Sequence, residues 1–247
     1  MRDNLVVHGI ILFQSAVGEN DKRFVILTRE RGKITVFARG ARRPGNQAMA
    51  LGPFAVGEFE VYEGREAYNL VKSAIKNYFR ELASDPGKAY YGFYFLEFAA
   101  YYAVENADET ELINLLYVTL RAIERDRMDI NLIRRIFELK VLAIEGEYPN
   151  VFECASCGSK DNLNAFSFKR RGLVCDKCRS DDDMTDVSGS CIYTMHYVIT
   201  ADTAQIYAFS ITDEVKKQFM YIVAKYLNMY VTHDFKSLEV LESIGLK

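Results

Sequence analysis

The apolar positions of the chain follow two different periods, and the change comes near residue 80. Before it, apolar runs of strand length are rich in valine, isoleucine and phenylalanine, and the turns between them carry glycine. This pattern predicts β-strands. We place five of them, at residues 5–13, 24–28, 33–38, 54–62 and 67–73.

The fourth predicted strand shows the alternation of a sheet with one buried face. Phe59 and Val61 lie on one side, and Glu58, Glu60 and Tyr62 lie on the other. Five short strands joined by glycine-bearing turns fit a small closed barrel such as the OB-fold. An SH3-like barrel would show the same pattern, so the strands alone leave both barrels open.

From about residue 85 onwards, the apolar positions recur with a helical period. Pro86, directly after Asp85, favours a helix start there, and Asp108 with Glu111 resembles a capping box for the next helix. We predict helices that start near 85 and 108, a helix over 130–144, one that starts at 212 or 213, and a short one over 237–243.

Four cysteines form two Cys-x2-Cys pairs with seventeen residues between the pairs. Each pair offers two sulfurs from one turn, and a loop of about 15–20 residues lets a short hairpin join the pairs into a tetrahedron. We predict a zinc ribbon with one structural Zn²⁺ on Cys154, Cys157, Cys175 and Cys178. The alternatives are two disulfides or four unrelated thiols, and residues 1–20 do not resemble the secretory signal that disulfides would suggest.

The composition is that of a globular protein, with 49% hydrophobic and 26% charged residues. Its most apolar stretch, 89–104, is too short to span a bilayer and contains Glu97, so we expect a buried helix and a cytoplasmic protein. The expected fold class is α+β, an N-terminal OB-fold β-barrel followed by an α-helical domain with an inserted four-cysteine zinc ribbon. We assign 1–80 to the barrel, 81–150 to the first helical part, 151–190 to the ribbon and 191–247 to the C-terminal helical part.

The net charge of −3 hides a basic N-terminal segment. Residues 1–80 contain thirteen Lys and Arg against eight Asp and Glu, whereas acidic residues outnumber basic ones in the rest of the chain. Six basic residues fall within fifteen positions that hold a single acid, Glu30; they are Arg29, Arg31, Lys33, Arg39, Arg42 and Arg43. A basic loop beside a barrel can follow a phosphate backbone, so we predict nucleic-acid contact there; the alternative is a solvated surface.

Three further expectations concern side chains that could contact nucleic acid or carry chemistry. Phe37 and Tyr62 could stack on bases, although we expect both in the barrel core. A second basic run, Lys169, Arg170 and Arg171, lies between the cysteine pairs, where a hairpin tip could touch DNA or merely be solvated. No hydrolase, P-loop or deaminase motif is present, and four thiolates leave a zinc ion no position for water, so we expect no catalysis.

Short stretches along the whole chain carry a family resemblance. They are Thr28–Lys33, Ala38–Pro44, Leu51–Phe54, Arg134–Lys140, Gly146 with Pro149, and Phe235–Leu238. In this order and spacing they resemble RecO, a family of bacterial recombination-mediator and DNA repair proteins. The departures are local, because Ile136 and Glu147 are extra residues and Phe235 replaces a leucine.

The resemblance implies a function that spacing alone does not give. Proteins of this family bind single- and double-stranded DNA, anneal complementary strands and, with RecR, help RecA load onto DNA coated by single-strand binding protein, as in RecF-pathway repair. Their helical domain also binds the acidic C-terminal tail of single-strand binding protein. Some members keep the four cysteines and others have lost them. The family implies a cytoplasmic protein, associated with the nucleoid during repair, and no membrane partner.

Arg134 and Arg135 are our expected contacts for that acidic tail, because they place two cations beside an apolar helix face. Salt bridges within the helix are the alternative for this pair. Two other functional classes also stay open at this point, a zinc-ribbon transcription or translation factor and an unrecognised hydrolase or nuclease.

Overall fold

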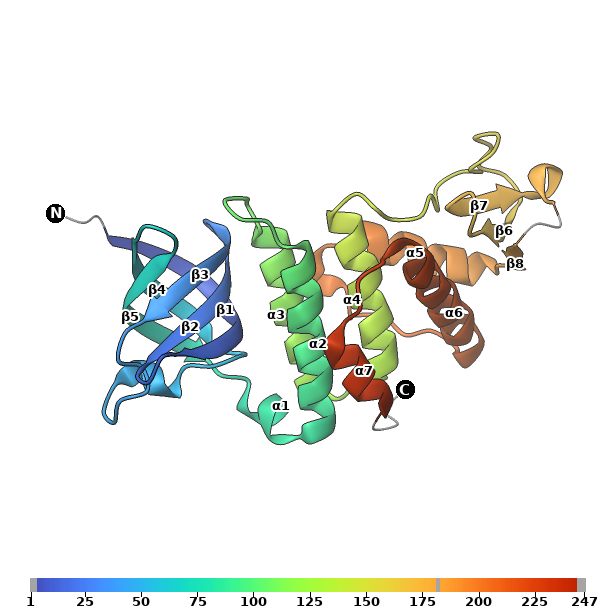
Figure 1. Cartoon of the computed structure of the whole chain (residues 1–247). Helices are drawn as coiled ribbons and strands as arrows, with labels where there is room; N and C mark the ends of the chain where they lie inside the picture. Colours follow the sequence, from blue (N-terminus) through green and yellow to red (C-terminus); the bar gives the residue numbers. More distant parts are fainter. Residues whose placement is uncertain (1–3, 181–182, 244–247) are drawn as a thin grey trace. The chain divides into compact units, whose positions relative to one another are not determined.

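The computed structural model describes residues 4–180 and 183–243, drawn in colour in Figure 1. The chain divides into two compact units. The barrel unit comprises Met1–Arg127 and Phe235–Lys247, and the ribbon unit comprises Met128–Asp234. The sequence of the ribbon unit is therefore inserted into that of the barrel unit. The boundaries expected at 80, 150 and 190 stay predictions.

Five strands of the barrel unit close into a barrel in the order β1-β2-β3-β5-β4 (Figure 1). The strands are β1 (Asn4–Val17), β2 (Asp21–Thr28), β3 (Gly32–Ala38), β4 (Val56–Glu63) and β5 (Tyr68–Asn77). Phe24, Val36 and Phe59 are fully buried inside, since every second side chain of a strand points inward. The OB-like barrel and the α+β class predicted from the sequence are confirmed, including the inward face of Phe59 and Val61.

One seam of the barrel is much shorter than the others. β3 and β5 run parallel and pair only at Val36↔Tyr68 and Phe37↔Asn69, whereas β2 and β3 pair at seven positions. After Ala38 the chain leaves the sheet and forms a loop to residue 55, which contains the 3₁₀ turn η1 (Gln47–Ala50). The seam therefore opens where this loop begins.

The helices of the barrel unit are α1 (Arg80–Ser84), α2 (Pro86–Tyr102), α3 (Thr110–Arg125) and α7 (Lys236–Ser243). Asp85 caps α2 as predicted, because its carboxylate accepts a hydrogen bond from the Lys88 backbone N–H at 3.1 Å. The predicted capping box at α3 is wrong. That helix begins only at Thr110, so Asp108 accepts from the Thr110 N–H, and Glu109 is the N-cap residue.

The end of the chain belongs to the barrel unit because Glu97 of α2 holds the start of α7. Its carboxylate accepts the backbone N–H groups of Lys236 at 3.1 Å and Ser237 at 2.9 Å. Phe235 is buried and stacks on Phe98 with ring centroids 5.0 Å apart. The single acid in the most apolar stretch of the sequence thus satisfies helix N–H groups that would otherwise lack partners.

The ribbon unit combines three helices with a small antiparallel sheet. The helices are α4 (Ile130–Ile144), α5 (Gly189–Thr200) and α6 (Asp213–Tyr230), the strands are β6 (Leu163–Ser167), β7 (Gly172–Cys175) and β8 (Met184–Asp186), and the 3₁₀ turns are η2 (Asp176–Cys178) and η3 (Thr203–Gln205). The sheet order is β7-β6-β8. α4 has its predicted limits, and Thr212 caps α6 by accepting from the Val215 N–H.

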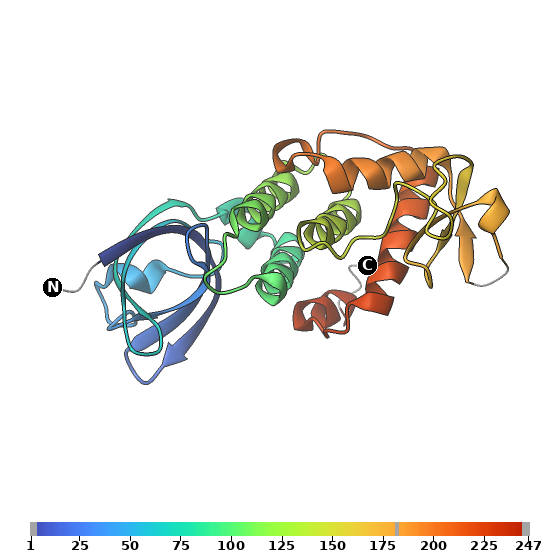
Figure 2. The same cartoon turned by 90° about the horizontal axis from the view of Figure 1, so that it is seen from above.

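The small sheet lies beside α6 (Figure 2). Aromatic side chains join the two, because Phe166 contacts Tyr226 and Phe168 contacts Tyr221, each edge to face. The Tyr230 hydroxyl donates to the Phe168 carbonyl at 2.5 Å, and the Arg171 guanidinium lies 3.9 Å from the centroid of the Tyr230 ring. Lys225 of α6 forms an ion pair with Asp183 at 2.6 Å. Among the described residues, no helix has the length and apolar character that a membrane crossing requires.

Candidate metal centre and nucleic-acid interface

The two cysteine pairs meet in the ribbon unit. The four sulfurs, from Cys154, Cys157, Cys175 and Cys178, all lie within 4.8 Å of one another. Cys157 and Cys175 come from different pairs, and their Sγ atoms are 3.7 Å apart. Tetrahedral zinc with Zn–S bonds of about 2.3 Å separates sulfurs by about 3.8 Å, so this donor set fits a metal site with four thiolate ligands.

Local backbone geometry explains how the first cysteine pair forms its turn. The Gly158 N–H donates to the Cys154 carbonyl at 2.9 Å, and Gly158 adopts φ +73°, a conformation that favours glycine. The Cys154 N–H donates to the Ser159 carbonyl at 2.7 Å. The β6–β7 hairpin then brings Cys175, at the end of β7, next to Cys154.

Backbone N–H groups point at one sulfur of the cluster. Burial would raise the pKa of Cys154, but the N–H groups of Cys175, Ser156 and Cys157 outweigh it and lower this pKa to about 6. A hydrogen bond with the Cys157 side chain is the main cause that raises the pKa of Cys178 to about 12. The first thiolate therefore forms readily and the last forms reluctantly, as expected when negative charge accumulates on neighbouring sulfurs.

The arginine loop, residues 39–43 after β3, is exposed at three side chains and tied at its backbone. Arg39, Arg42 and Arg43 are all exposed. The Gly40 N–H donates to the Asp21 carboxylate at 2.7 Å, and the Arg42 N–H donates to the Asn20 carbonyl at 2.8 Å. The loop thus presents three guanidinium groups from a backbone that the β1–β2 turn holds in place.

Lys22 supports the far end of the same loop segment. Its Nζ donates to the carbonyls of Met49 at 2.9 Å and Leu51 at 3.1 Å. Burial lowers the pKa of Lys22, and the positive charge of Arg42 lowers it further. Lys22 therefore anchors the loop instead of adding to its exposed charge.

The other half of the predicted basic cluster lies at the opposite end of β3. Arg29 donates to Asn114 of α3 at 2.9 Å, and Lys33 donates to the Ala100 carbonyl of α2 at 2.7 Å. The Arg31 side chain is exposed, but its carbonyl accepts the Asn106 N–H at 3.0 Å. The six residues do not form one patch, because a seven-residue strand of about 20 Å separates the two groups.

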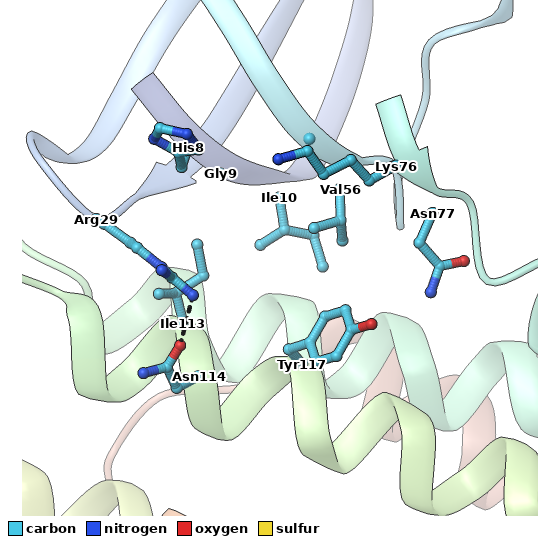
Figure 3. A pocket seen from close by; sticks show the side chains of 11 residues that line it. His8, Gly9, Ile10, Arg29, Val56, Lys76, Asn77, Ile113, Asn114 and Tyr117 are labelled. Atoms are coloured by element: carbon cyan, nitrogen blue, oxygen red, sulfur yellow. Dashed lines mark hydrogen bonds between the residues drawn. The ribbon is translucent and has the colours of Figure 1, made fainter. Parts of the chain in front are cut away.

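A pocket of about 300 Å³ lies beside Arg29, between the barrel and α3 (Figure 3). Its polar groups include His8, Lys76 and Asn77, and Tyr117 of α3 lines it from the other side. Lys76 at its edge is paired with the Glu58 carboxylate, whereas Arg29 is hydrogen-bonded to the neutral amide of Asn114 and keeps its positive charge.

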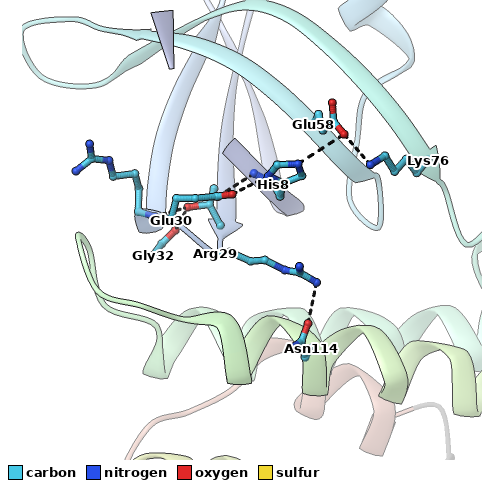
Figure 4. A network of polar contacts seen from close by, with 9 residues as sticks. His8, Arg29, Glu30, Gly32, Glu58, Lys76 and Asn114 are labelled. Atoms are coloured by element: carbon cyan, nitrogen blue, oxygen red, sulfur yellow. Dashed lines mark hydrogen bonds and ion pairs between the residues drawn. The ribbon is translucent and has the colours of Figure 1, made fainter. Parts of the chain in front are cut away.

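His8 lies between two acidic side chains, Glu30 and Glu58, on the outer face of the barrel (Figure 4). Its Nδ1 is 2.6 Å from the Glu30 carboxylate, and its Nε2 is 3.6 Å from that of Glu58. Glu58 also pairs with Lys76 at 2.6 Å, and this hydrogen bond is the main reason that the pKa of Glu58 is lowered. His8 is therefore satisfied by partners and lies exposed on the outer face of the barrel.

The outer face of β2 and β3 adds residues that the sequence patterns did not single out. Arg23 is exposed and pairs in register with Phe37, so both side chains lie on the same outer face. Phe37 and Tyr62 are half-buried and lie outside the barrel core, which corrects their expected place. The alternation of Arg23 with buried Phe24 could have identified Arg23. The corresponding face of OB-folds binds oligonucleotides.

A hollow of about 250 Å³ lies where the β3–β5 seam opens beside the arginine loop. It is lined by Ala38, Arg39, Asn46, Gln47, Ala48, Leu70, Val71, Lys72 and Ser73. Asn46 shapes its edge, since its amide donates to the Arg39 carbonyl at 3.4 Å and its Oδ1 accepts the Ala48 N–H at 2.9 Å.

In the second basic run, residues 169–171, the two arginines contact other parts of the ribbon unit, and the lysine is exposed at the hairpin turn. Arg170 donates to Ser156 at 2.6 Å and to the Cys178 carbonyl at 3.0 Å, so it bridges both cysteine pairs. Arg171 stacks on Tyr230. Lys169 is exposed at the hairpin turn and is the best placed of the three for a partner.

Arg134 and Arg135 share one buried acid. Arg134 Nε donates to Glu138 at 2.8 Å, and Arg135 Nη1 donates to the other oxygen of Glu138 at 2.7 Å. Only 12% and 17% of the two arginine side chains are exposed, and Glu138 is fully buried. This is the geometry expected of salt bridges within the helix.

Comparisons with known proteins cover both units. The family model of the recombination protein O N terminal matches residues 1–79, and that of the recombination protein O C terminal matches residues 83–239. The chain is 28% identical over 240 residues to the DNA repair protein RecO of Alkaliphilus metalliredigens, covering 96% of this chain and 98% of that protein. It is also 28% identical over 242 residues to the DNA repair protein RecO of Halalkalibacterium halodurans, covering 96% and 95%.

The protein of the same description from Clostridium acetobutylicum is 26% identical over 238 residues and is covered over 96% of both chains. The relatives are thus matched over almost their whole length, and the C-terminal family model alone spans more than half of the chain. The chain belongs to the recombination protein O (RecO) family.

Proposed function

We propose that the protein is a DNA-binding recombination mediator in DNA repair. It binds single- and double-stranded DNA, anneals complementary strands and, with RecR, helps RecA load onto DNA coated by single-strand binding protein. The observation that carries this proposal is the arginine loop, with three exposed guanidinium groups on a tied backbone at the edge of a closed barrel. Membership of the family supports it over the whole chain.

The proposed mechanism is electrostatic and involves no covalent step. Arg39, Arg42 and Arg43 contact phosphates and release condensed counterions, which needs no particular base sequence. Two complementary strands near one positive surface repel each other less, so they meet more often and anneal faster. Arg23 extends this surface in the barrel unit, and Lys169 offers a separate contact in the ribbon unit, whereas Arg29 and Lys33 chiefly hold the barrel to α2 and α3.

We propose that the four cysteines bind one structural Zn²⁺. All four ligands come from the protein, so the ion stabilises the ribbon without an open coordination position for catalysis. Lys225, Tyr230 and Arg171 would then transmit that stability to α6. A protein that works by binding alone needs no other cofactor.

We also propose that the helical part of the ribbon unit binds the acidic tail of single-strand binding protein. Arg134 and Arg135 are bonded to Glu138, so they would contact the tail only through the small part of each side chain that is exposed. A peptide titration of the Arg134→Ala/Arg135→Ala variant tests this assignment, and unchanged affinity rejects it. The protein would act in the cytoplasm, at the nucleoid during repair.

The deciding experiment is annealing of complementary strands coated with single-strand binding protein. We expect the wild-type protein to accelerate annealing and the Arg39→Ala/Arg42→Ala/Arg43→Ala variant to be much slower at the same salt concentration. Absence of acceleration by the wild-type protein would reject the mediator function. Competition with random-sequence DNA and incubation with Mg²⁺ test the two other classes, a sequence-specific factor and a nuclease.

A further inference from the structure

The hollow at the β3–β5 seam is built from the barrel itself. Ala38 and Leu70 stand where the next pair of the parallel ladder would form, but the chain turns away into the arginine loop and the two sides separate. The hollow therefore opens directly beside Arg39, the first guanidinium of the loop.

The lining of the hollow has an apolar part and a positively charged part. Ala48, Leu70 and Val71 give it an apolar part, and Arg39 and Lys72 bring two positive charges to its edge. None of the described residues that line it is acidic. An apolar space between two cations suits a ligand with an apolar body and negatively charged ends.

Two polar side chains of the lining have unused hydrogen-bonding capacity. Gln47 and Ser73 both line the hollow, and within the described part of the chain neither side chain makes a hydrogen bond. An amide and a hydroxyl can each donate and accept, so they can pair with the edge of more than one kind of base. They therefore suit recognition that does not depend on sequence.

We propose that this hollow takes one unpaired nucleotide of a DNA strand, with the base inside and the flanking phosphates on Arg39 and Lys72. The inference rests on the proposed DNA binding and adds a preference to it. A base in a single strand can turn into the hollow at a small cost in free energy, whereas a duplex must first break a base pair and its stacking. The hollow makes the barrel prefer single strands, while the arginine loop binds both forms.

Strands without bases provide the test, because they keep every phosphate. We measure the affinity of the full-length protein for an oligothymidine, for an abasic strand of equal length and for a duplex. The wild-type protein should bind the oligothymidine about tenfold more tightly than the abasic strand, the equivalent of one or two hydrogen bonds. Equal affinity for the two single strands would overturn the inference and leave the proposed function intact.

Two variants locate the effect. Ser73→Leu fills the hollow, and Gln47→Ala removes one polar group without adding bulk, so at least one of them should fold normally. Each should lower oligothymidine affinity toward that of the abasic strand and leave duplex affinity unchanged. Gln14→Ala is the matched control, an exposed glutamine of β1 outside the lining.

The outcomes separate this inference from the proposed function. A wild-type protein that binds none of the three nucleic acids at low salt contradicts DNA binding itself. Variants that fold and keep the full preference for the oligothymidine contradict the hollow as its cause. Loss of duplex and single-strand binding together in Gln47→Ala would also contradict it, since the base alone should be affected.

Discussion

At the scale of single residues, several charged side chains are held by partners inside the fold. Glu138 holds both Arg134 and Arg135 from a fully buried position, and Arg170 bridges the two cysteine pairs. The three arginines of the loop after β3 have exposed side chains, and Arg42 also donates to the Gly18 carbonyl at 3.2 Å. The physical distinction is between cations that satisfy buried acceptors and cations whose charge reaches solvent.

Replacing Glu138 with glutamine should destabilise the ribbon unit. The substitution removes the carboxylate that two largely buried guanidinium groups share, and removal of one partner from a buried ion pair typically lowers the free energy of unfolding by about 3 kcal/mol. Urea denaturation of both variants, Glu138→Gln and a control, measures the change. The control is Asp213→Ala, because the pair of Asp213 with Lys216 is solvated and should contribute little stability. Equal effects of the two changes would contradict the buried role of Glu138.

Glu30 should make stability depend on acid pH. Burial acts to raise its pKa, but the backbone N–H and ring of His8 outweigh this and lower the pKa below the ordinary 4.5. A carboxylate with a lowered pKa stabilises the fold at pH values above 4.5, and that contribution disappears as pH falls through the lower, folded-state value. The Glu30→Gln variant should be less stable than wild type at pH 7, by about 0.5 kcal/mol at most because the group is partly exposed, and the difference should shrink as pH falls below 4.5. Thermal melts at pH 7 and below pH 4.5 check this, and a constant difference would count against it.

Sequence spacing predicted the cysteine cluster more completely than the arrangement of the basic residues. The four cysteines form two local pairs, so their spacing along the chain nearly determines their spacing in the fold. The basic residues instead straddle β3, and only the length and direction of that strand show that Arg29 and Arg39 lie at different ends. Arg170 was unpredictable as a structural bridge, because its partners lie on two turns that are joined only by folding.

At the scale of elements, the arginine loop acts as a unit because its backbone N–H groups are bonded to Asn20 and Asp21, and Lys22 holds the segment that follows it. A loop held in this way keeps three guanidinium groups at fixed spacing and loses little conformational freedom on binding. The helix limits at 130–144 and the cap at Thr212 were predictable from local patterns. The start of α3 was not, because Glu109 is engaged by the Val104 N–H at 2.7 Å, a contact beyond the capping pattern.

Removing the three loop arginines should reduce the salt dependence of DNA binding. Each contacted phosphate contributes about 0.7 to the slope of log affinity against log salt for single strands, so Arg39→Ala/Arg42→Ala/Arg43→Ala should lower the slope by about 2. Fluorescence anisotropy titrations at several salt concentrations give the slope. The control variant Arg65→Ala/Arg125→Ala/Arg127→Ala removes the same charge from exposed positions elsewhere in the barrel unit and should change the slope little. If both triple variants behave alike, net charge and not the loop is responsible.

At the scale of the whole molecule, the chain forms two compact units that carry different candidate sites. The barrel unit carries the exposed basic loop, and the ribbon unit carries the cysteine cluster. The α+β class and the barrel followed directly from the two apolar periods. The return of the chain end to the barrel unit did not, because it depends on Glu97 and Phe98, more than 130 residues away from the segment that they hold.

Zinc removal should loosen the ribbon unit selectively. The purified protein should contain about one zinc per chain, and Cys154→Ser should lose it and expose residues 151–187 to hydrogen exchange, because metal binding and folding of such modules are coupled. Cys191→Ala is the control, since Cys191 is buried in α5 away from the four ligands and its loss should leave the zinc content unchanged. Full protection of the ribbon in Cys154→Ser without metal would contradict a structural ion.

The return of the chain end has a practical consequence for anyone who wishes to study the barrel by itself. A truncation after residue 127 would remove both Phe235 and α7. Phe98 would lose its stacking on Phe235, and Glu97 would lose the backbone N–H groups of Lys236 and Ser237 that donate to it. An internal deletion that joins 127 to 235 through a flexible linker retains the residues that make these contacts. The deleted segment, Met128–Asp234, is the ribbon unit and could be produced as a separate polypeptide.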